Sequence, residues 1–307
     1  MDSFLSCNNI TKQYTGHRAL DDVSIAVPKG CIYGLLGPNG AGKTSLIRII
    51  NQITKPDSGV VLFNGEPLGQ KHIKNVGYLP EERGLYKKMK VGDQAVYFAR
   101  LRGMGKAEAG KKLLQWFRKF EIETWWNKKV EELSKGMQQK IQFIVTIVHE
   151  PELLIFDEPF SGFDPINVDL LKNEILHLKE KGTTIIFSTH NMSSVEELCD
   201  YICLIDNGKN ILSGEIHEVR NQFKDSLMEI RIDRPLDNLS SILPAGVVVL
   251  EQKQNNIFNQ INVQTPSEMV TNEIIEAIVP HARIISFSES LPSMHDIFVQ
   301  EVKKNKP

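Results

Sequence analysis

The stretch Gly37-Pro-Asn-Gly-Ala-Gly-Lys43-Thr44 determines how the rest of this sequence is interpreted. It fits the pattern G-x-x-x-x-G-K-[ST] and stands between the apolar run 32–36 and the helical pattern 45–50. Glycines let backbone N–H groups turn inward around phosphate oxygens, and the following helix offers its N-terminal dipole to the same anion. The stretch therefore predicts a phosphate-binding loop in which Lys43 reaches the β- and γ-phosphates and the Thr44 hydroxyl binds Mg²⁺.

A second candidate site follows the apolar run 153–156, which ends in Asp157 and Glu158. Enzymes with this kind of phosphate loop hold Mg²⁺ with an Asp at the end of an apolar strand. We expect Asp157 to bind Mg²⁺ through water and Glu158 to orient or deprotonate the attacking water. An apolar run that ends in two acids is weak evidence alone, but beside the phosphate loop it predicts a nucleotide hydrolysis site.

The pattern along the chain predicts two domains. Up to about residue 222, short apolar runs alternate with helical patterns, which predicts a largely parallel sheet with helices on both faces, interrupted by a helical insertion near 85–150. Residues 223–307 contain no phosphate motif. Their order of strands (228–232, 246–250, 257–263), helix (268–279), strand (282–287) and helix (294–302) predicts a small α+β domain.

Composition narrows the class of protein. The chain has 307 residues, 41% hydrophobic and 24% charged, and a net charge of −2, which gives no basic surface for nucleic acid. Apolar runs are far shorter than the roughly 20 residues of a membrane span, and no signal peptide is evident at the start. Four scattered Cys match neither a disulfide framework nor a zinc site. We expect a cytoplasmic protein without a membrane anchor of its own.

Over roughly residues 4–220 the sequence resembles the nucleotide-binding subunits of ABC transporters. The signature of that family, usually Leu-Ser-Gly-Gly-Gln-Gln, corresponds to Leu133-Ser134-Lys135-Gly136-Met137-Gln-Gln. Ser134 and Gly136 match it, whereas Lys135 and Met137 depart from the usual Gly and Gln. The resemblance implies a helix N-terminus that contacts the γ-phosphate bound to a partner subunit. It also implies the fold of a P-loop NTPase, with a mainly parallel sheet, an antiparallel β subdomain and the helical insertion.

Further residues match the family in order. Asp164, in Ser161-Gly-Phe-Asp164, resembles the D-loop between two composite sites, and His190 matches the histidine that bonds the γ-phosphate and the catalytic Glu. Tyr14 stands where an aromatic ring stacks on adenine. With Glu158 and His190 as catalytic residues, the resemblance implies an ATP site formed by Tyr14, Gly37, Pro38, Asn39, Gly40, Ala41, Gly42, Lys43, Thr44, Ser45, Ser134, Gly136 and Asp164.

Glu81 is a departure from the family pattern. Members commonly have Gln after a Gly-Tyr-Leu-Pro-like strand, where it binds Mg²⁺ and relays the state of the site to the permease; here Gly77-Tyr-Leu-Pro-Glu81 places a carboxylate there. Glutamate keeps an oxygen for Mg²⁺, so we expect Thr44, Glu81 and Asp157 to hold the metal, with altered hydrolysis or coupling. The run 77–86 and Pro292-Ser-Met-His-Asp-Ile-Phe298 resemble a subgroup with sodium-efflux (NatA-like) and drug-exporting members.

These features predict an ATPase subunit, with ATP and Mg²⁺ as cofactors, that drives a separate membrane permease. One phosphate loop and one signature require a second cassette, in a homodimer or a heterodimer, and the expected location is the inner face of the cell membrane. The alternative is a soluble ABC-type ATPase that acts on ribosomes or nucleic acid. Such proteins usually carry two cassettes, coiled-coil insertions or zinc modules, none of which is evident here, and we expect no nucleic-acid partner.

Overall fold

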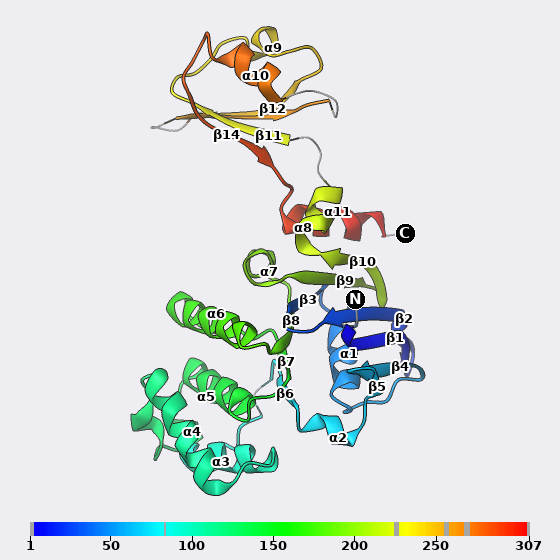
Figure 1. Cartoon of the computed structure of the whole chain (residues 1–307), viewed down its shortest axis with the longest axis vertical. Helices are drawn as coiled ribbons and strands as arrows, with labels where there is room; N and C mark the ends of the chain where they lie inside the picture. Colours follow the sequence, from blue (N-terminus) through cyan, green and yellow to red (C-terminus); the bar gives the residue numbers. More distant parts are fainter. Residues whose placement is uncertain (1–2, 83, 224–226, 255–257, 267–270, 306–307) are drawn as a thin grey trace. The chain divides into compact units, whose positions relative to one another are not determined.

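A computed structural model describes residues 3–82, 84–223, 227–254, 258–266 and 271–305. The chain divides into two compact units, each of which is described by itself. The first contains residues 1–216 and 301–307, and the second contains residues 217–300. Figure 1 gives the labels of the helices and strands.

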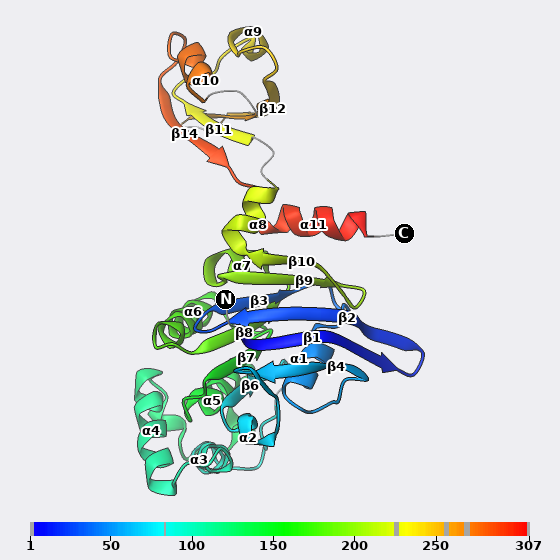
Figure 2. The same cartoon turned by 45° about the vertical axis from the view of Figure 1, so that its right-hand side comes forward.

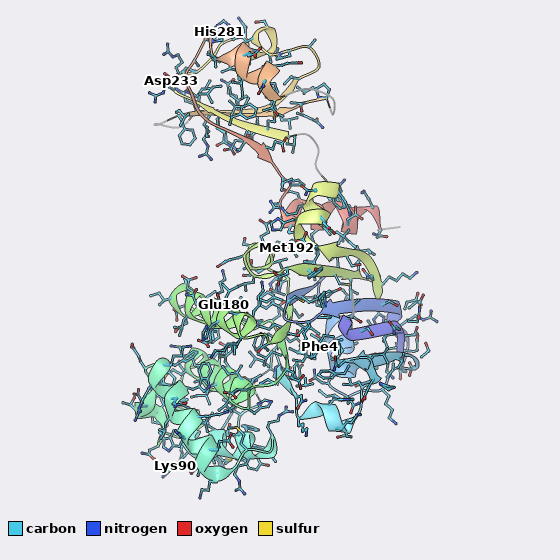
Figure 3. All side chains as sticks on the ribbon, in the orientation of Figure 1. Phe4, Lys90, Glu180, Met192, Asp233 and His281 are labelled. Carbon is cyan, nitrogen blue, oxygen red and sulfur yellow. The ribbon has the colours of Figure 1, made fainter. Side chains whose placement is uncertain are left out.

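An antiparallel sheet forms one layer of the first unit, with strand order β2-β1-β4-β5. Its strands are β1 (Ser3–Tyr14), β2 (His17–Pro28), β4 (Ser58–Phe63) and β5 (Glu66–Pro67). Phe4 on β1 (Figure 3) packs on Phe63 of β4, with ring centroids 4.8 Å apart. This sheet is the expected antiparallel β subdomain.

A second sheet has the strand order β10-β9-β3-β8-β7-β6. The pairs β9–β3, β3–β8, β8–β7 and β7–β6 are parallel, and the pair β9–β10 is antiparallel. Every residue of the central strands β3, β7 and β8 is buried, as expected for a parallel sheet covered on both faces. The strands are β3 (Ile32–Leu36), β6 (Val76–Leu79), β7 (Leu153–Asp157), β8 (Thr184–Thr189), β9 (Tyr201–Asp206) and β10 (Lys209–Glu215).

Helices cover the parallel sheet. Helix α1 (Lys43–Ile50) shares one hydrophobic core with both sheets, and Figure 1 shows α5 (Lys135–Ile147), α6 (Pro165–Glu180) and α7 (Met192–Leu198) on the other side of the parallel strands. The expected helical insertion consists of α3 (Val91–Leu101), α4 (Lys106–Lys119), two 3-10 turns (Glu123–Trp125 and Val130–Glu132) and α5. The short helix α2 (Gln70–Ile73) precedes β6. The mainly parallel P-loop fold predicted from the sequence is thus confirmed.

The topology explains where a site can form. Strands β3, β7 and β8 are parallel neighbours, so their carboxyl ends meet at one edge of the sheet. The phosphate loop follows β3, Asp157 ends β7, and His190 follows β8. Figure 2 shows the two sheets and α1 from a second direction.

The second unit contains a four-stranded antiparallel sheet with strand order β12-β13-β11-β14. Residues Met228, Ile230 and Ile232 alternate along β11 toward a core shared with α10. The elements after β10 are α8 (Ile216–Gln222), β11 (Leu227–Ile232), α9 (Leu239–Ile242), β12 (Val248–Gln254), β13 (Asn259–Gln264), α10 (Thr271–Ile278), β14 (Ile284–Ser290) and α11 (Met294–Lys304). The predicted α+β order is confirmed, although α9 was not expected; residues 257 and 268–270 of the predicted elements lie outside the described residues.

Among the described helices, none combines the length and the apolar character needed to cross a membrane.

Candidate functional site

The loop between β3 and α1 has a shape that only glycine allows at two positions. Gly37 has a φ of 148°, and a Cβ there would lie 2.1 Å from the carbonyl oxygen of Ile205. Gly42 has a φ of 113°, and a Cβ there would lie 2.4 Å from the carbonyl oxygen of Ala19. Both conformations are unfavourable for other residues, and both contacts are with rigid backbone. The glycines of the motif are therefore required by the fold of the loop as well as by phosphate binding.

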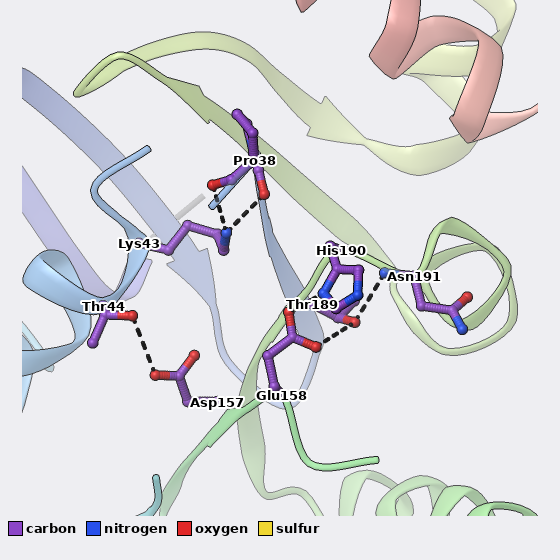
Figure 4. A network of polar contacts seen from close by, with 9 residues as sticks. Pro38, Lys43, Thr44, Asp157, Glu158, Thr189, His190 and Asn191 are labelled. Carbon is purple, nitrogen blue, oxygen red and sulfur yellow. Dashed lines mark hydrogen bonds and ion pairs between the residues drawn. The ribbon is translucent and has the colours of Figure 1, made fainter. Parts of the chain in front are cut away.

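Lys43 begins α1 and is buried. Its Nζ donates to the carbonyl oxygens of Gly37 at 2.7 Å and Pro38 at 3.0 Å, so the side chain lies across the loop (Figure 4). Burial lowers the pKa of Lys43, and the nearby charges of Glu158 and Asp157 partly oppose that shift. The ammonium group is thus placed where an anion on the loop would meet it.

Asp157, the last residue of β7, is 3% exposed. The Thr44 hydroxyl donates to its Oδ2 at 3.5 Å, which brings together two of the three groups that the sequence predicts as metal ligands (Figure 4). Burial is the main cause that raises the pKa of the Asp157 carboxyl, and the charges of Glu81 and Glu158 raise it further. A cation at this carboxylate would relieve both effects.

Glu158 turns sharply away from the end of β7, with a φ of 49°, while its backbone N–H donates to the Ser188 carbonyl at 2.9 Å. His190 Nδ1 lies 2.7 Å from Glu158 Oε1, and the Thr189 hydroxyl donates to Oε2 at 3.3 Å (Figure 4). The Asn191 backbone N–H in turn donates to the Thr189 hydroxyl at 3.1 Å. The carboxylate is therefore held on both oxygens by residues that follow β8.

These side chains line one cavity of about 510 Å³. Of the predicted site residues, the cavity is lined by Tyr14, Asn39, Gly40, Ala41, Gly42, Lys43, Thr44, Ser45, Glu81, Asp157, Glu158 and His190. Tyr14 ends β1 with its side chain half exposed, and Lys12 Nζ lies 5.6 Å from the centroid of its ring. Gly37 and Pro38 contribute the carbonyl groups that bind Lys43.

Ser134, Gly136 and Asp164 do not line this cavity. Ser134 caps α5, where its hydroxyl accepts from the Met137 N–H at 3.3 Å, and a Cβ at Gly136 would meet no atom within 4 Å. Asp164 caps α6 and accepts from the Asn167 N–H at 3.1 Å; this bond and a second from the Asn167 side chain hold the pKa of its carboxyl below the usual range. These residues stand at two exposed helix starts.

Sequence reasoning missed several residues that support the site. His17 pairs with Tyr14 across the turn between β1 and β2 and lines the cavity with Ala19. Gln139 of α5 donates to the Ser161 carbonyl, and the Ser161 N–H donates to the Glu158 carbonyl at 3.1 Å, which connects α5 to the segment after β7. The repeated Gln after the signature was visible in the sequence, but its partner lies 22 residues away and only the fold identifies it.

The oxygen donors suit Mg²⁺. Thr44, Asp157 and Glu81 supply hydroxyl and carboxylate oxygens, which Mg²⁺ prefers. Within the described residues, no group of three or more His, Cys, Asp and Glu side chains is arranged to hold a metal by itself. Mg²⁺ usually binds through one or two carboxylates together with substrate phosphates and waters.

Known family profiles match parts of both units of the chain. The family profile described as ABC transporter matches residues 20–161, and the one described as ATP-binding protein DrrA1-3-like, C-terminal domain, matches residues 214–302. A third, described as AAA domain, putative AbiEii toxin, Type IV TA system, matches residues 129–196.

Individual relatives cover most of the chain. The uncharacterized ABC transporter ATP-binding protein YhaQ of Bacillus subtilis (strain 168) is 43% identical over 97% of this chain and 98% of its own length. The ABC transporter ATP-binding protein NatA of the same organism is 34% identical over 66% of this chain and 84% of its own length. The linearmycin resistance ATP-binding protein LnrL, also of that organism, is 28% identical over 96% of this chain and 97% of its own length. A solved structure titled "Structure of ATP binding subunit of ABC transporter" has 31% identity and a TM-score of 0.67, covering 72% of this chain and 93% of that one.

Proposed function

The chain belongs to the ATP-binding subunits of ABC transporters and is an ATPase, and on this premise we propose that it powers an exporter whose permease is a separate protein. The observation that carries the proposal is the convergence of the phosphate loop, Asp157, Glu158 and His190 on one cavity.

The phosphate loop holds the nucleotide. Lys43 exchanges its bonds to the carbonyls of Gly37 and Pro38 for charge-assisted bonds to phosphate oxygens, and the free N–H groups at the start of α1 face the same anion. Tyr14, at the rim of the same cavity, offers its ring to the adenine. When bound, Mg²⁺ neutralises phosphate charge, and Thr44, Asp157 and Glu81 are the residues that would hold it.

Glu158 is the general base in this proposal. Its carboxylate is fixed by His190 and Thr189, and each carboxylate oxygen retains acceptor capacity for the attacking water. His190 is also exposed enough, at 68% of its side chain, to bond a γ-phosphate oxygen as well as Glu158. The pair would orient water on one side and phosphate on the other.

A second cassette completes the site. Ser134 and Gly136 open a helix of 13 residues whose start is exposed, but they do not line the cavity of their own chain. A helix start with open space around Gly136 can approach the phosphates of a nucleotide on another subunit. The partner cassette is either a second copy of this chain or a related one, and Asp164 lies in the segment that would face it.

The permease is proposed to dock in a groove beside the helical insertion. This groove, of about 360 Å³, is lined by Tyr78, Pro80, Gly84, Leu85, Phe98, Leu101, Arg102, Gln142, Val145 and Thr146. Tyr86 stacks on Phe98 nearby, with centroids 6.1 Å apart, and is 54% exposed. An exposed aromatic ring beside a groove of mixed polar and apolar lining is typical of a protein interface. A short cytoplasmic segment of the permease is the occupant we propose.

The groove is connected to the ATP cavity through adjacent residues. Pro80 lines the groove, and the next residue, Glu81, lines the ATP cavity. A shift of the segment after β6 therefore changes the groove and the ATP cavity together. Such a shift links the binding of nucleotide to the contact with the permease. Arg102 adds specificity, because its guanidinium uses one donor on the Ile73 carbonyl at 3.0 Å and keeps others for a carboxylate of the permease.

Export is favoured by the second unit and by the relatives. The C-terminal family of residues 214–302 is named for DrrA1-3-like proteins, and LnrL, similar over nearly the whole chain, is named for linearmycin resistance. A resistance protein of this class is expected to move its compound outward. The proposed location is therefore the inner face of the cell membrane, where the chain is held by its permease.

Fractionation of cells tests the proposal against the ribosome alternative. The full chain is expressed with and without the membrane protein encoded beside it, and its distribution among membranes, ribosomes and soluble protein is measured. Recovery with membranes only when that partner is present is the expected result. A Leu101→Glu variant should no longer be recovered with membranes, because it puts a charge in the groove. A Leu114→Glu variant, on the neighbouring helix, should still be recovered with membranes. Firm association with ribosomes or DNA, and none with membranes, would contradict the exporter.

A further inference from the structure

Resting on the proposed function, we infer that Glu81 makes this ATP site selective for the metal-complexed nucleotide: it repels free ATP and admits ATP whose charge is partly neutralised by Mg²⁺.

Glu81 is positioned to act through its charge. It follows Pro80 at the end of β6 and lines the ATP cavity together with Lys43, Asp157 and Glu158. Its side chain is exposed, and in the described part of the chain it forms no ion pair and no hydrogen bond. Among the described residues of the cavity, Lys43 is the cation whose pKa the charge of Glu81 raises, and none of them bonds the Glu81 carboxylate directly.

The charges in the cavity are unbalanced. Among the described lining residues, the carboxylates are Glu81, Asp157 and Glu158, and the only permanently cationic side chain is Lys43. The charge of Glu81 affects two other groups of the site. It raises the pKa of the Asp157 carboxyl, and it favours the charged form of Lys43, which burial disfavours. The next carboxylate along the chain, Glu82, is exposed and does not line the cavity.

Free ATP carries up to four negative charges, and each cavity carboxylate opposes its entry. A Gln at position 81 would keep an oxygen donor for Mg²⁺ but remove one unit of this repulsion. With Mg²⁺ bound to the phosphates, the carboxylate of Glu81 faces a cation and its effect changes from repulsion to attraction. Glu81 thus sets how strongly nucleotide binding depends on the metal.

The test measures binding and does not depend on turnover. The full chain is titrated with a non-hydrolysable β,γ-imido analogue of ATP, in excess EDTA and in excess Mg²⁺, and the ratio of the two dissociation constants is compared among variants. The variants are Glu81→Gln, Glu81→Asp, which keeps the charge, and Glu82→Gln as the matched control. Because position 81 is exposed, these substitutions leave the fold intact.

Glu81→Gln should tighten binding in EDTA by about tenfold at low salt and change binding in Mg²⁺ by less than about threefold, so that the ratio falls. Glu81→Asp and Glu82→Gln should keep the wild-type ratio. At about 0.5 M salt, screening of the charges should reduce the difference in this ratio between the wild type and Glu81→Gln.

An unchanged ratio in Glu81→Gln would overturn the inference. So would a loss of binding confined to Mg²⁺, because that result makes Glu81 a metal ligand without a repulsive role. Failure of the wild-type chain to bind the analogue under either condition would instead contradict the proposed function itself.

Discussion

The proposed ATP cavity of the first unit and the sheet face of the second unit opposite its core both carry charged and polar side chains, but these are arranged in opposite ways. On the sheet, Gln260 donates to Glu229 at 2.9 Å and Arg231 pairs with the same carboxylate at 2.8 Å. In the cavity, Lys43 bonds only loop carbonyls, and Asp157 is buried with a raised pKa. On the sheet, the charge of Glu229 is thus paired with a cation, whereas Lys43 and Asp157 converge on a cavity where their charges can act on a ligand.

The largest expected effect is the loss of hydrolysis in Glu158→Gln. The amide keeps the shape and can still bond His190, but it cannot take a proton, so the rate of phosphate release should fall by about 100- to 10,000-fold while ATP binding remains. Glu229→Gln, on the sheet of the second unit, should keep the wild-type rate. Brisk turnover in Glu158→Gln would remove this residue from the role of general base.

A core substitution in the second unit should have the next largest effect, on stability alone. Ile230 is fully buried in the core beneath the sheet, and Ile230→Ala should cost about 2–5 kcal/mol in the free energy of unfolding of that unit. The three Trp residues, Trp116, Trp125 and Trp126, all belong to the first unit, so their fluorescence reports that unit while circular dichroism reports both.

In Ile230→Ala, circular dichroism should show a transition at a lower denaturant concentration than in the wild type. The unfolding transition reported by Trp fluorescence and the ATP affinity should be unchanged. Ile285→Ala, at a side chain that is 51% exposed, serves as the control and should shift neither signal appreciably. A parallel loss of ATP binding in Ile230→Ala would show that the cavity depends on the second unit.

Lys43→Ala should weaken ATP binding by removing charge-assisted contacts to phosphate. Such contacts contribute about 1.5–3 kcal/mol to binding, so their loss should raise the dissociation constant of ATP by roughly 10- to 150-fold. Calorimetric titration measures this constant. Lys29→Ala removes an exposed cation before the start of β3, at the opposite end of that strand, and should leave the affinity unchanged. Equal affinities of wild type and Lys43→Ala would contradict the role of the loop.

The smallest effect should be a gain in stability in Asp157→Asn. Burial raises the pKa of this carboxyl above its ordinary value, so the carboxyl binds its proton more tightly in the folded state than in the unfolded state. The free energy of unfolding therefore falls as the pH rises through that pKa. In EDTA at pH 7.5, removing the buried charge should raise the thermal midpoint by about 2–4 °C, or about 1 kcal/mol. The gain should shrink toward acid pH, where the wild-type carboxyl takes up its proton; a lower midpoint at pH 7.5 would refute the electrostatic cost.

The sequence predicted the parallel strands and the phosphate loop well, for a physical reason. Strands buried on both faces appear as continuous apolar runs, such as Leu153–Phe156, and the glycines that the loop needs leave a recognisable spacing. The long strands β1 and β2 were harder to predict, because register shifts after Ser3, Cys7, Ile10 and Lys12 interrupt their alternation.

Contacts between distant segments could not be predicted. Thr189 directly precedes His190 in the sequence, but its bond to Glu158 depends on the pairing of β7 with β8. Likewise, Gln139 reaches the Ser161 carbonyl only because α5 and the segment after β7 lie together in the fold. Periodicity gives the elements, whereas the partners of single polar groups follow from topology.

Amide hydrogen exchange of the full chain, with and without Mg·ATP, tests the central claim most directly. Slower exchange in the loop 37–45 and around Glu158 and His190, with no change in β11 and β13 of the second unit, is the predicted result. Protection confined to the second unit, or no protection of the loop at saturating ATP, would contradict the account.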